Sequence, residues 1–397
     1  MKIIHNNETI TGENIYSCEI SEYCDLISNE IASNTLTVKL KVPVEKVFKK
    51  KDQIVCVDNN DNIMGYFYIE TAKLVDYISY DNSYVYDINA NDIVYYLEDY
   101  DFLGAYYTEI DLESVLTSMF RNTGITLIIP ASLKEYKISG YCPAGNLREA
   151  LQSLCFTNNL IVNTSRINGI ELRIEDDITK NVIEYEKIFG TDIDVNDELT
   201  GVSATATSYL YPKSDSDRNT LFEGVFTDYD LGETIQTITF EPHQYFLIEN
   251  GVILDATTCF AAIQANNGTD TVKLTGIPYV KTQISYTKGD KKNSVVINNN
   301  TMINIYNINN LISNVYDYYS NTHTANIDCL YAGNVPGDRI AVKTKFGLVY
   351  GRISEQTISI TNATQRVKMT VEGALLPPQE SYYTPNELRT GDKLGII

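Results

Sequence analysis

Acidic and amide side chains at two places in the chain have a spacing that could bind a metal ion. In the first, Asp58, Asn60 and Asn62 occupy alternate positions, as the first oxygen ligands of a calcium-binding loop do. Such a loop also needs a glycine at its sharp turn and a closing glutamate, and Ile63 and Ile69 stand at those positions here. We therefore interpret this segment as a polar turn.

The second acidic group consists of Asp192, Asp194, Asp197 and Glu198. Carboxylates this close can hold calcium, or can act as an acid and a base because their mutual repulsion separates their pKa values. The interpretation that we favour is a solvated linker between two domains. The metal-binding and acid-base alternatives stay open at this stage.

The histidines and cysteines form no recognisable catalytic or metal-binding pattern. His5, His243 and His323 are far apart in the sequence, so only the fold could assemble a zinc site from them. The cysteines are odd in number and include no C-x-x-C pair, which predicts reduced core residues rather than disulfides. The seven are Cys18, Cys24, Cys56, Cys142, Cys155, Cys259 and Cys329.

Familiar catalytic motifs are also missing from the sequence. It has no G-x-S-x-G turn, no glycine-rich phosphate loop, no H-E-x-x-H pair and no dinucleotide-binding fingerprint. We therefore expect a protein that is not an enzyme, with no catalytic residues, no metal and no cofactor.

Composition and charge narrow the class of protein. The 397 residues, 43% hydrophobic and 21% charged, are typical of a globular chain with several domains. The net charge of −21 argues against a nucleic-acid-binding surface, because such a surface needs clustered lysine and arginine. It is compatible with a channel for DNA, since an acidic lining repels phosphate and lets a polyanion pass without sticking.

No segment of the sequence predicts export or membrane insertion. The first ten residues lack the apolar core of a signal peptide, and no apolar run approaches the length of a membrane span. We therefore expect synthesis in the cytoplasm and no membrane insertion.

One spacing of residues occurs twice. In each copy an Asp-x-Ile segment begins an alternating run, a turn follows, and the returning strand carries a glycine where a larger side chain would crowd a neighbouring backbone. Each copy predicts a β-hairpin, and the pair favours two related β-barrels or sheets. The alternative is two unrelated hairpins that agree at a few positions. The residues that align without a gap are Asp52 with Asp338, Ile54 with Ile340, Gly65 with Gly351, Phe67 with Ile353 and Thr71 with Thr357.

The periodicity of apolar residues divides the chain into blocks. Helical spacing begins behind Asp111 and again behind Asn146, where Glu149 occupies the capping-box position, and a longer helix is expected at 308–319. The predicted fold is α+β and mainly β, with two related β-barrel domains, an inserted helix-plus-sheet domain and a second insertion. The boundaries are 1–98 for the first β-barrel domain, 99–195 for the α+β domain, 196–212 with 325–374 for the second β-barrel domain, 213–324 for the inserted domain and 375–397 for an extended C-terminal arm.

Short segments along most of the chain are similar to one family. The segments are Ser17–Ile20, Asn34–Leu36, Asp52–Ile54, Gly65–Ile69, Ile138–Pro143, Leu147–Gln152, Asn163–Arg166 and Gly337–Ile340. Together they resemble baseplate hub proteins of phage tails from Gram-positive hosts, including those of phage-tail-like bacteriocins. The stretch 213–324 carries little of this resemblance.

The resemblance implies a structural role in a virion or phage-tail-like particle. Such hubs are homotrimers in which each subunit contributes two related β-barrels, so that three chains present six barrels to a hexameric tail tube. The implied partners are the tail tube protein, the central spike protein and other baseplate proteins, and the ring would allow DNA or a tape-measure protein to pass. Asp52, Gly65, Asp338 and Gly351 would be structural residues, because the family's hubs have no active site.

Two other classes of function remain open on the sequence alone. A tail-tip enzyme that hydrolyses cell-wall glycan, or a receptor-binding module, would display a carboxylate pair in an aromatic cleft, which some of the 30 tyrosines could line. A secreted β-rich adhesin is a further alternative, and the missing signal peptide and unpaired cysteines weigh against it.

Overall fold

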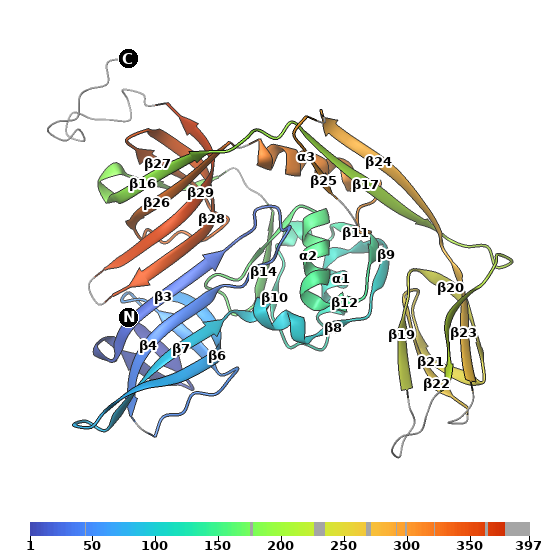
Figure 1. Cartoon of the computed structure of the whole chain (residues 1–397), viewed down its shortest axis with the longest axis horizontal. Coiled ribbons are helices and arrows are strands. Elements are labelled where there is room, and N and C mark those ends of the chain that lie inside the picture. The colour runs from blue at the N-terminus through green and yellow to red at the C-terminus, as the bar shows by residue number, and fades with distance from the viewer. Residues whose placement is uncertain are drawn as a thin grey trace.

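The computed structural model describes residues 1–377 apart from 44, 175–177, 226–234, 267–270, 291, 298–299, 321 and 362–363. Strands dominate these residues, and the helices gather in the middle of the molecule and beside one long strand ribbon (Figure 1). The mainly β, α+β fold class that the sequence predicts is confirmed.

Thirteen strands join in one large sheet. Alternating residues along these strands pack into a single apolar core, to which both ends of the chain contribute. Two strands pair beside the main path: β15 (Thr179–Ile183) pairs with β27 (Arg339–Thr344), which pairs with β28. The path runs β16 (Ile188–Val195), β26 (His323–Leu330), β29 (Gln365–Leu376), β28 (Gly347–Ile360), β3 (Ile15–Tyr23), β4 (Thr35–Pro43), β7 (Ser83–Asn91), β6 (Ile63–Ile78), β5 (Gln53–Val57), β1 (Lys2–His5) and β2 (Glu8–Thr11).

The large sheet contains the same strand arrangement twice. In the N-terminal sheet unit, β3 to β7, the spatial order is β3-β4-β7-β6-β5. In the C-terminal sheet unit, β16 and β26 to β29, the order is β16-β26-β29-β28-β27. If the five strands of each unit are numbered in chain order, both units place them in space as first, second, fifth, fourth and third. The two predicted hairpins are therefore the third and fourth strands of two like-ordered units.

A helical unit lies beside the sheet units (Figure 1). Its helices pack on short strands around a core that includes Leu116, Ile138 and Leu151. The capping box predicted from Asn146 and Glu149 is present. Asp111 stands at the other predicted N-cap, but its side chain makes no capping bond, and Lys137 pairs with it instead at 2.7 Å. The elements are β8 (Asp101–Phe102), β9 (Ala105–Asp111), α1 (Leu112–Met119), β10 (Leu127–Ile128), β11 (Lys137–Cys142), β12 (Gly145–Asn146), α2 (Leu147–Thr157), β13 (Leu160–Asn163) and β14 (Ile170–Ile174).

A long strand ribbon leads from the sheet units across the helical unit to a small β module (Figure 1). The ribbon consists of β17 (Gly201–Leu210), β24 (Val280–Gly289) and β25 (Ser294–Ile297), and α3 (Ile308–Tyr319) packs on it. The β module has two three-stranded sheets with a core of Ala261, Ile263, Val272 and Leu274. Its strands are β18 (Asn219–Val225), β19 (Ile235–Thr239), β20 (His243–Glu249), β21 (Gly251–Ala256), β22 (Phe260–Ala265) and β23 (Thr271–Pro278).

The strand pairing differs from the expected domain boundaries at three places. β15 and β16 fall in the segment assigned to the α+β domain, but they join the large sheet. β17 was assigned to the second β-barrel domain, but it pairs with β24 and β25 in a separate sheet, because alternation predicts a strand without indicating its partners. β29 extends to Leu376, two residues into the expected C-terminal arm, and the arm's residues 378–397 lie outside the described part of the chain.

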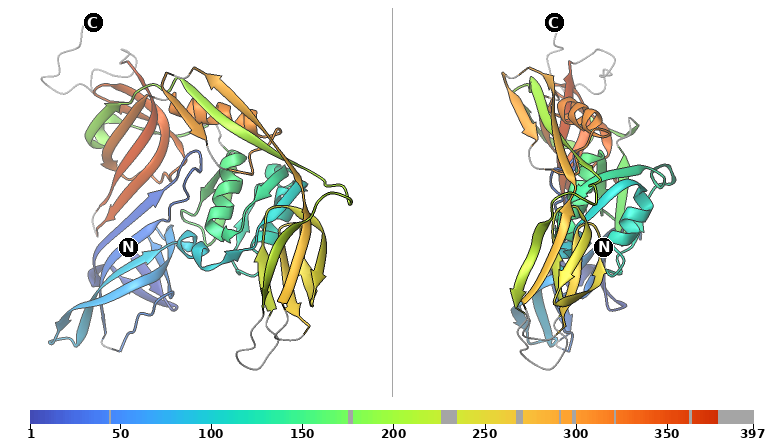
Figure 2. Two further views of the ribbon diagram at one scale, coloured as in Figure 1. Left: turned by 45° about the vertical axis from the view of Figure 1, so that its right-hand side comes forward. Right: turned by 90° about the vertical axis from the view of Figure 1, so that its right-hand side faces the viewer.

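Seen from the side, the molecule is narrow (Figure 2). The sheet units lie at one side of this flat arrangement and the small β module at the other, with the helical unit between them. Of the described residues, none forms a helix long and apolar enough to cross a membrane.

Candidate assembly interface

Asp52 forms a tight turn at the start of β5. Its N–H donates to the carbonyl of Lys49 at 3.1 Å, and its Oδ2 accepts the Lys49 N–H at 3.2 Å. Its own carbonyl accepts the N–H of Ile69 in β6 at 2.9 Å. Lys51 adopts a left-handed φ of 68° to complete the turn. The aspartate thus joins the turn to the neighbouring strand.

Asp338 forms the same turn at the start of β27. Its N–H donates to the carbonyl of Val335 at 3.1 Å, and its Oδ2 accepts the Val335 N–H at 3.0 Å. Its carbonyl accepts the N–H of Ile353 in β28 at 3.1 Å, and Gly337 has a φ of 89°. The structure therefore places Asp52 and Asp338 at equivalent positions of the two sheet units.

The returning strands match with a shift of two residues relative to the gap-free sequence alignment. Because Asp52 bonds to Ile69 and Asp338 to Ile353, these two isoleucines are equivalent. The register shifts in β6 between Ile69 and Thr71, and in β28 between Ile353 and Glu355, agree with this match. Gly351 is consequently equivalent to Phe67 rather than to Gly65. The cause is the turn between the strands, which is longer in the first hairpin.

The two predicted glycines have different surroundings. A Cβ added at Gly351 would lie 2.3 Å from the carbonyl oxygen of Glu372 and 3.0 Å from the Cα of Gly373, both in β29. A Cβ added at Gly65 would instead lie 2.4 Å from the ring of Phe67. Only Gly351 thus lies against neighbouring backbone.

His5 from β1 adds a further contact to the Asp52 turn. Its Nε2 lies 3.0 Å from Asp52 Oδ2, and its ring lies 4.8 Å from that of Phe48, measured between centroids. Partial burial raises the pKa of Asp52, but bonds from His5 and from the Lys49 N–H outweigh this and hold it below its usual range. The carboxylate is therefore charged at neutral pH.

The two sheet units are joined by an antiparallel pair, β3 with β28. Residues Cys18–Tyr23 lie opposite Glu355–Ile360. Ile20 and Ile358 face each other and are completely buried in the shared core. On the opposite, polar face, Ser21 Oγ and Thr357 Oγ1 are 3.2 Å apart. This internal junction buries apolar side chains on one face and pairs polar ones on the other.

A buried ion pair connects the helical unit to this junction. Glu22 is 1% exposed, and its Oε2 accepts from Arg166 at 3.0 Å and from Gln356 at 2.6 Å. Burial raises the pKa of Glu22, and Arg166 and Gln356 partly oppose that rise. Sequence reasoning missed this group because its members are 144 and 334 positions apart, so no local pattern brings them together.

The polar face of the C-terminal sheet unit is hollowed. A cavity of about 640 Å³ lies over β16, β26, β28 and β29, and its lining includes Asp192, Asp328, Glu355 and Lys368. Asp192 and Asp194 lie within β16, so the interpretation of this acidic group as a linker is wrong for these two residues. Asp197 and Glu198 lie beyond the end of the strand.

Comparison with solved structures relates this architecture to tail proteins. A tail protein from Neisseria meningitidis MC58 matches with a TM-score of 0.59 at 8% identity, over 94% of this chain and 95% of that one. The 43 kDa tail protein of prophage MuSo2 from Shewanella oneidensis matches with a TM-score of 0.54 at 9% identity, over 93% and 97%. Prophage tail protein gp18 from Listeria monocytogenes EGD-e gives 0.50 at 11%, over 93% of each chain.

The chain has the fold of phage tail proteins. The resemblance expected from the sequence is thereby confirmed at the level of the fold. No family model matches the sequence, and no curated protein matches it. The match to each tail protein covers almost the whole length of both chains, so the helical unit and the insertion belong to the shared fold.

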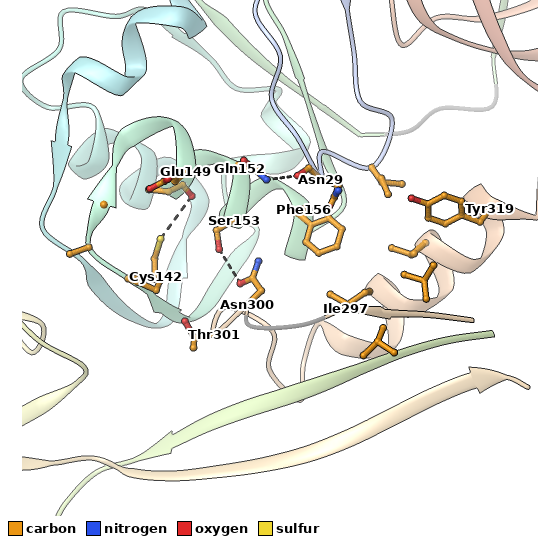
Figure 3. A pocket seen from close by; sticks show the side chains of 18 residues that line it. Asn29, Cys142, Glu149, Gln152, Ser153, Phe156, Ile297, Asn300, Thr301 and Tyr319 are labelled. Carbon is orange, nitrogen blue, oxygen red and sulfur yellow. Dashed lines mark hydrogen bonds between the residues drawn. The ribbon is translucent and has the colours of Figure 1, made fainter. Parts of the chain in front are cut away.

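A cavity of about 690 Å³ lies between α2, α3 and β25 (Figure 3). Ser153 donates to Asn300 Oδ1 at 3.0 Å, and the Glu149 side chain accepts the backbone N–H of Asn146 in the capping box. Burial raises the pKa of the Cys142 thiol to about 12, which makes it a poor nucleophile at neutral pH. The side chains that line this cavity therefore form no pair of a nucleophile and a base.

The remaining candidate ligands are separated in the tail-protein fold. Asp58 accepts the N–H groups of Asn60 at 2.7 Å and Asn62 at 2.8 Å, which confirms the polar turn. Within the described residues, no three His, Cys, Asp or Glu side chains are grouped as metal ligands. All seven cysteines are buried and unpaired, as expected of core residues.

Tyrosines concentrate at the joint between the helical unit and the ribbon. Tyr106 packs against Tyr209 and Tyr279, with ring centroids 5.8 and 5.4 Å away, and its hydroxyl donates to the Tyr209 carbonyl at 3.0 Å. Tyr141 also packs against Tyr209. These rings form a small core around Cys259 and stiffen the joint.

Proposed function

We propose that this protein is a structural hub of a phage tail or phage-tail-like particle, a homotrimeric ring that joins the tail tube to the central spike at the baseplate. The observation that carries the proposal is the pair of like-ordered sheet units joined side by side in one sheet. Three such chains would present six similar units around one axis.

The physical reason for this arrangement is a mismatch of symmetry. A six-fold tube repeats its contacts twice as often around the axis as a three-fold spike does, so an adaptor between them must offer both symmetries. A subunit with an internal duplication does so, because a trimer of it is six-fold in its sheet units and three-fold in its other parts. The matching Asp52 and Asp338 turns support the duplication at residue level.

The polar face of the sheet units would line the channel of the ring. It carries short polar side chains such as Ser21, Thr37 and Thr357 beside charged ones such as Lys368 and Glu355. A lining of this kind offers few apolar or purely basic surfaces to which DNA or a tape-measure protein would adhere.

The helical unit and the small β module would contact the spike and other baseplate proteins. They lie on one side of the sheet units, outside the duplicated part of the chain (Figures 1 and 2). The role is non-enzymatic in this proposal. It is supported by the absence of a nucleophile paired with a base among the described side chains that line the cavity between α2, α3 and β25, and by the packing of the clustered tyrosines into a joint.

The proposal is tested by the mass of the purified chain in solution, from light scattering coupled to size exclusion. The chain is measured alone and with the tube and spike proteins encoded beside it. We expect a trimer, or a monomer that becomes a trimer with those partners. A stable monomer that ignores both proteins and cleaves or binds peptidoglycan would contradict the hub and favour a tail-tip enzyme or receptor-binding module.

A further inference from the structure

Among the strand edges of the large sheet that have no strand beside them in the described part of the chain, two belong to the duplicated sheet units. One is the outer edge of β16, at the end of the sheet. The other is the edge of β6 from Thr71 to Ile78, because β5 pairs only with the first part of β6. Open edges expose unpaired N–H and C=O groups, which favour pairing with another strand.

The internal junction shows what occupies the equivalent edge of the other unit. β28 is the counterpart of β6, and its second part, Glu355–Ile360, pairs with β3. The register shift that follows Ile69 in β6 follows Ile353 in β28, so Thr71–Leu74 corresponds to Glu355–Ile358. A second shift in β6, between Leu74 and Asp76, ends this match.

The other side of the junction is matched in the same way. β3 has a register shift between Ile15 and Ser17, and β16 has one between Ile188 and Gly190. The residues skipped by these shifts, Tyr16 and Phe189, are both exposed aromatics. Ile193 of β16 is thereby equivalent to Ile20 of β3.

The pairings across each sheet unit give the same equivalence independently. From Ile20 the pairing leads through Leu36, Ala90 and Ile69 in the N-terminal unit. From Ile193 it leads through Ala325, Val371 and Ile353 in the C-terminal unit. Both paths end on the isoleucine whose N–H bonds to the turn aspartate, so the two units share one register along this path.

Side-chain exposure indicates that a neighbour is missing from both open edges. Leu74 is 48% exposed, whereas its counterpart Ile358 is completely buried. Val195 is 74% exposed, whereas its counterpart Glu22 is 1% exposed. An apolar side chain on the core face of a sheet edge is left in water only when the next strand is absent.

We propose that the open edge of β6 in one chain pairs antiparallel with β16 of a second copy, in the register of the internal junction. This inference rests on the proposed ring, since it supplies the contacts between its chains. Backbone bonds would continue the sheet from one chain to the next. The residues placed opposite each other, up to the second register shift of β6, are Thr71 and Asn196, Ala72 and Val195, Lys73 and Asp194, and Leu74 and Ile193.

The side chains brought together are complementary on both faces. Leu74 meets Ile193 on the core face, as Ile358 meets Ile20 inside the chain. Lys73 meets Asp194 on the polar face, where the internal junction has the Thr357 and Ser21 hydroxyls. A cross-strand pair of opposite charges stabilises a sheet and selects its register.

The same geometry sets what closure into a ring requires. The contact joins two different edges, so it is a head-to-tail contact that repeats from chain to chain. Since it copies the internal junction, each step turns by the angle that relates the two units of one chain. A closed trimer requires six such steps, half of them internal, to complete one full turn.

Cysteine cross-linking tests the register. The bond from the Cys24 N–H to the Ser354 carbonyl puts Glu355 and Tyr23 in a non-hydrogen-bonded pair, and every second pair along the strands is of this kind. Lys73 and Asp194 correspond to such a pair, whose Cα atoms are close enough for a disulfide. The experiment oxidises the full chain carrying Lys73→Cys and Asp194→Cys and analyses it without reductant by mass. The matched control carries Lys73→Cys and Asp192→Cys, two residues out of register.

The outcomes separate this inference from the proposed ring. We expect the in-register variant to form covalent closed trimers at least tenfold faster than the control. Linked dimers and longer open chains would support the edge pairing and contradict the ring. A trimer in light scattering whose cysteines link no faster than the control would leave the ring standing and overturn the edge pairing. Failure to link with the tube and spike proteins present would also overturn it.

A charge exchange provides a second test that needs no oxidation. Lys73→Asp and Asp194→Lys each place like charges opposite each other and should weaken association about fivefold per junction, whereas the double variant restores it. Lys368→Asp is the control, because β29 is paired on both sides and Lys368 lies away from the open edges. Equal effects of all three single variants, or no recovery in the double variant, would contradict the pairing of Lys73 with Asp194.

Discussion

The turns at Asp52 and Asp338 make the same hydrogen bonds from different sequences. The first runs Lys49-Lys50-Lys51-Asp52 and the second Val335-Pro336-Gly337-Asp338, so the aspartate is the one shared residue. Its carboxylate accepts the N–H three positions earlier in both turns. A short carboxylate side chain suits this bond, which explains how the turn is kept while its other residues differ.

At residue scale, the two glycines should respond differently to substitution. Gly351→Ala places a methyl group against the backbone of β29, which cannot move without breaking the sheet, and should destabilise the chain by about 3 kcal/mol. Gly65→Ala presses only on the Phe67 ring and should cost about 1 kcal/mol. Urea unfolding of the two variants measures the difference. Equal losses would contradict the packing described for Gly351.

At the scale of elements, the Glu22 ion pair holds three parts of the fold together. It joins β3, β28 and the loop after β13. Its interaction with Arg166 offsets part of the cost of burying the carboxylate, and Tyr331 stacks on the guanidinium at 5.4 Å.

Arg166→Ala should therefore destabilise the chain by about 3 kcal/mol, because it leaves Glu22 buried without its charge partner. Adding Glu22→Gln to this variant should recover most of the loss, since no buried charge remains. Thermal unfolding of the single and double variants measures both effects. If the double variant were no more stable than the single one, the contact would owe its effect to packing rather than to charge.

Asp92 makes the stability of the chain depend on pH. It caps the 3₁₀ helix Ile93–Asp99 by accepting the Val94 N–H at 3.1 Å, and its other oxygen accepts from the Asn34 N–H at 3.0 Å and from Thr164. Complete burial raises the pKa of Asp92 from 3.8 to about 6 despite these bonds.

A raised folded-state pKa means that folding favours the protonated carboxyl. This contribution to stability is complete below about pH 4 and is lost as the pH rises through about 6. Asp92→Asn cannot titrate, so the unfolding free energy of the natural chain minus that of the variant should fall by about 3 kcal/mol over this range. Urea unfolding at a series of pH values tests it, and parallel curves for the two proteins would contradict it.

Local patterns in the sequence were sufficient to predict some elements of the fold and insufficient to predict others. The capping box of α2 and the hairpins begun by Asp52 and Asp338 depend on neighbouring residues, so spacing predicted them. The sheet that β17 joins, the inclusion of Asp192 in β16 and the Glu22 contact depend on residues far apart in the chain. The two-residue shift that separates Gly65 from Gly351 arises in turn length, which a gap-free alignment cannot detect. The open edges became visible only in the structure, where Leu74 and Val195 are exposed apolar side chains.

At the scale of the whole molecule, the proposed hub and its contacts follow from the duplication of one sheet unit within the chain. The β3 and β28 junction fixes how the two units of one chain sit beside each other. The open edges of β6 and β16 repeat that junction between chains. The helical unit and the β module need not obey the six-fold repeat, which leaves them available to three-fold or asymmetric partners.

The most direct measurement is a single-particle electron microscopy reconstruction of the assembled protein, computed without imposed symmetry. The account predicts a three-fold particle in which six sheet units surround one channel, the aspartate turns alternate around it, and β6 of each chain lies beside β16 of the next. A particle whose sheet units from different chains do not touch, or one in which the helical units alone hold the chains together, would contradict it.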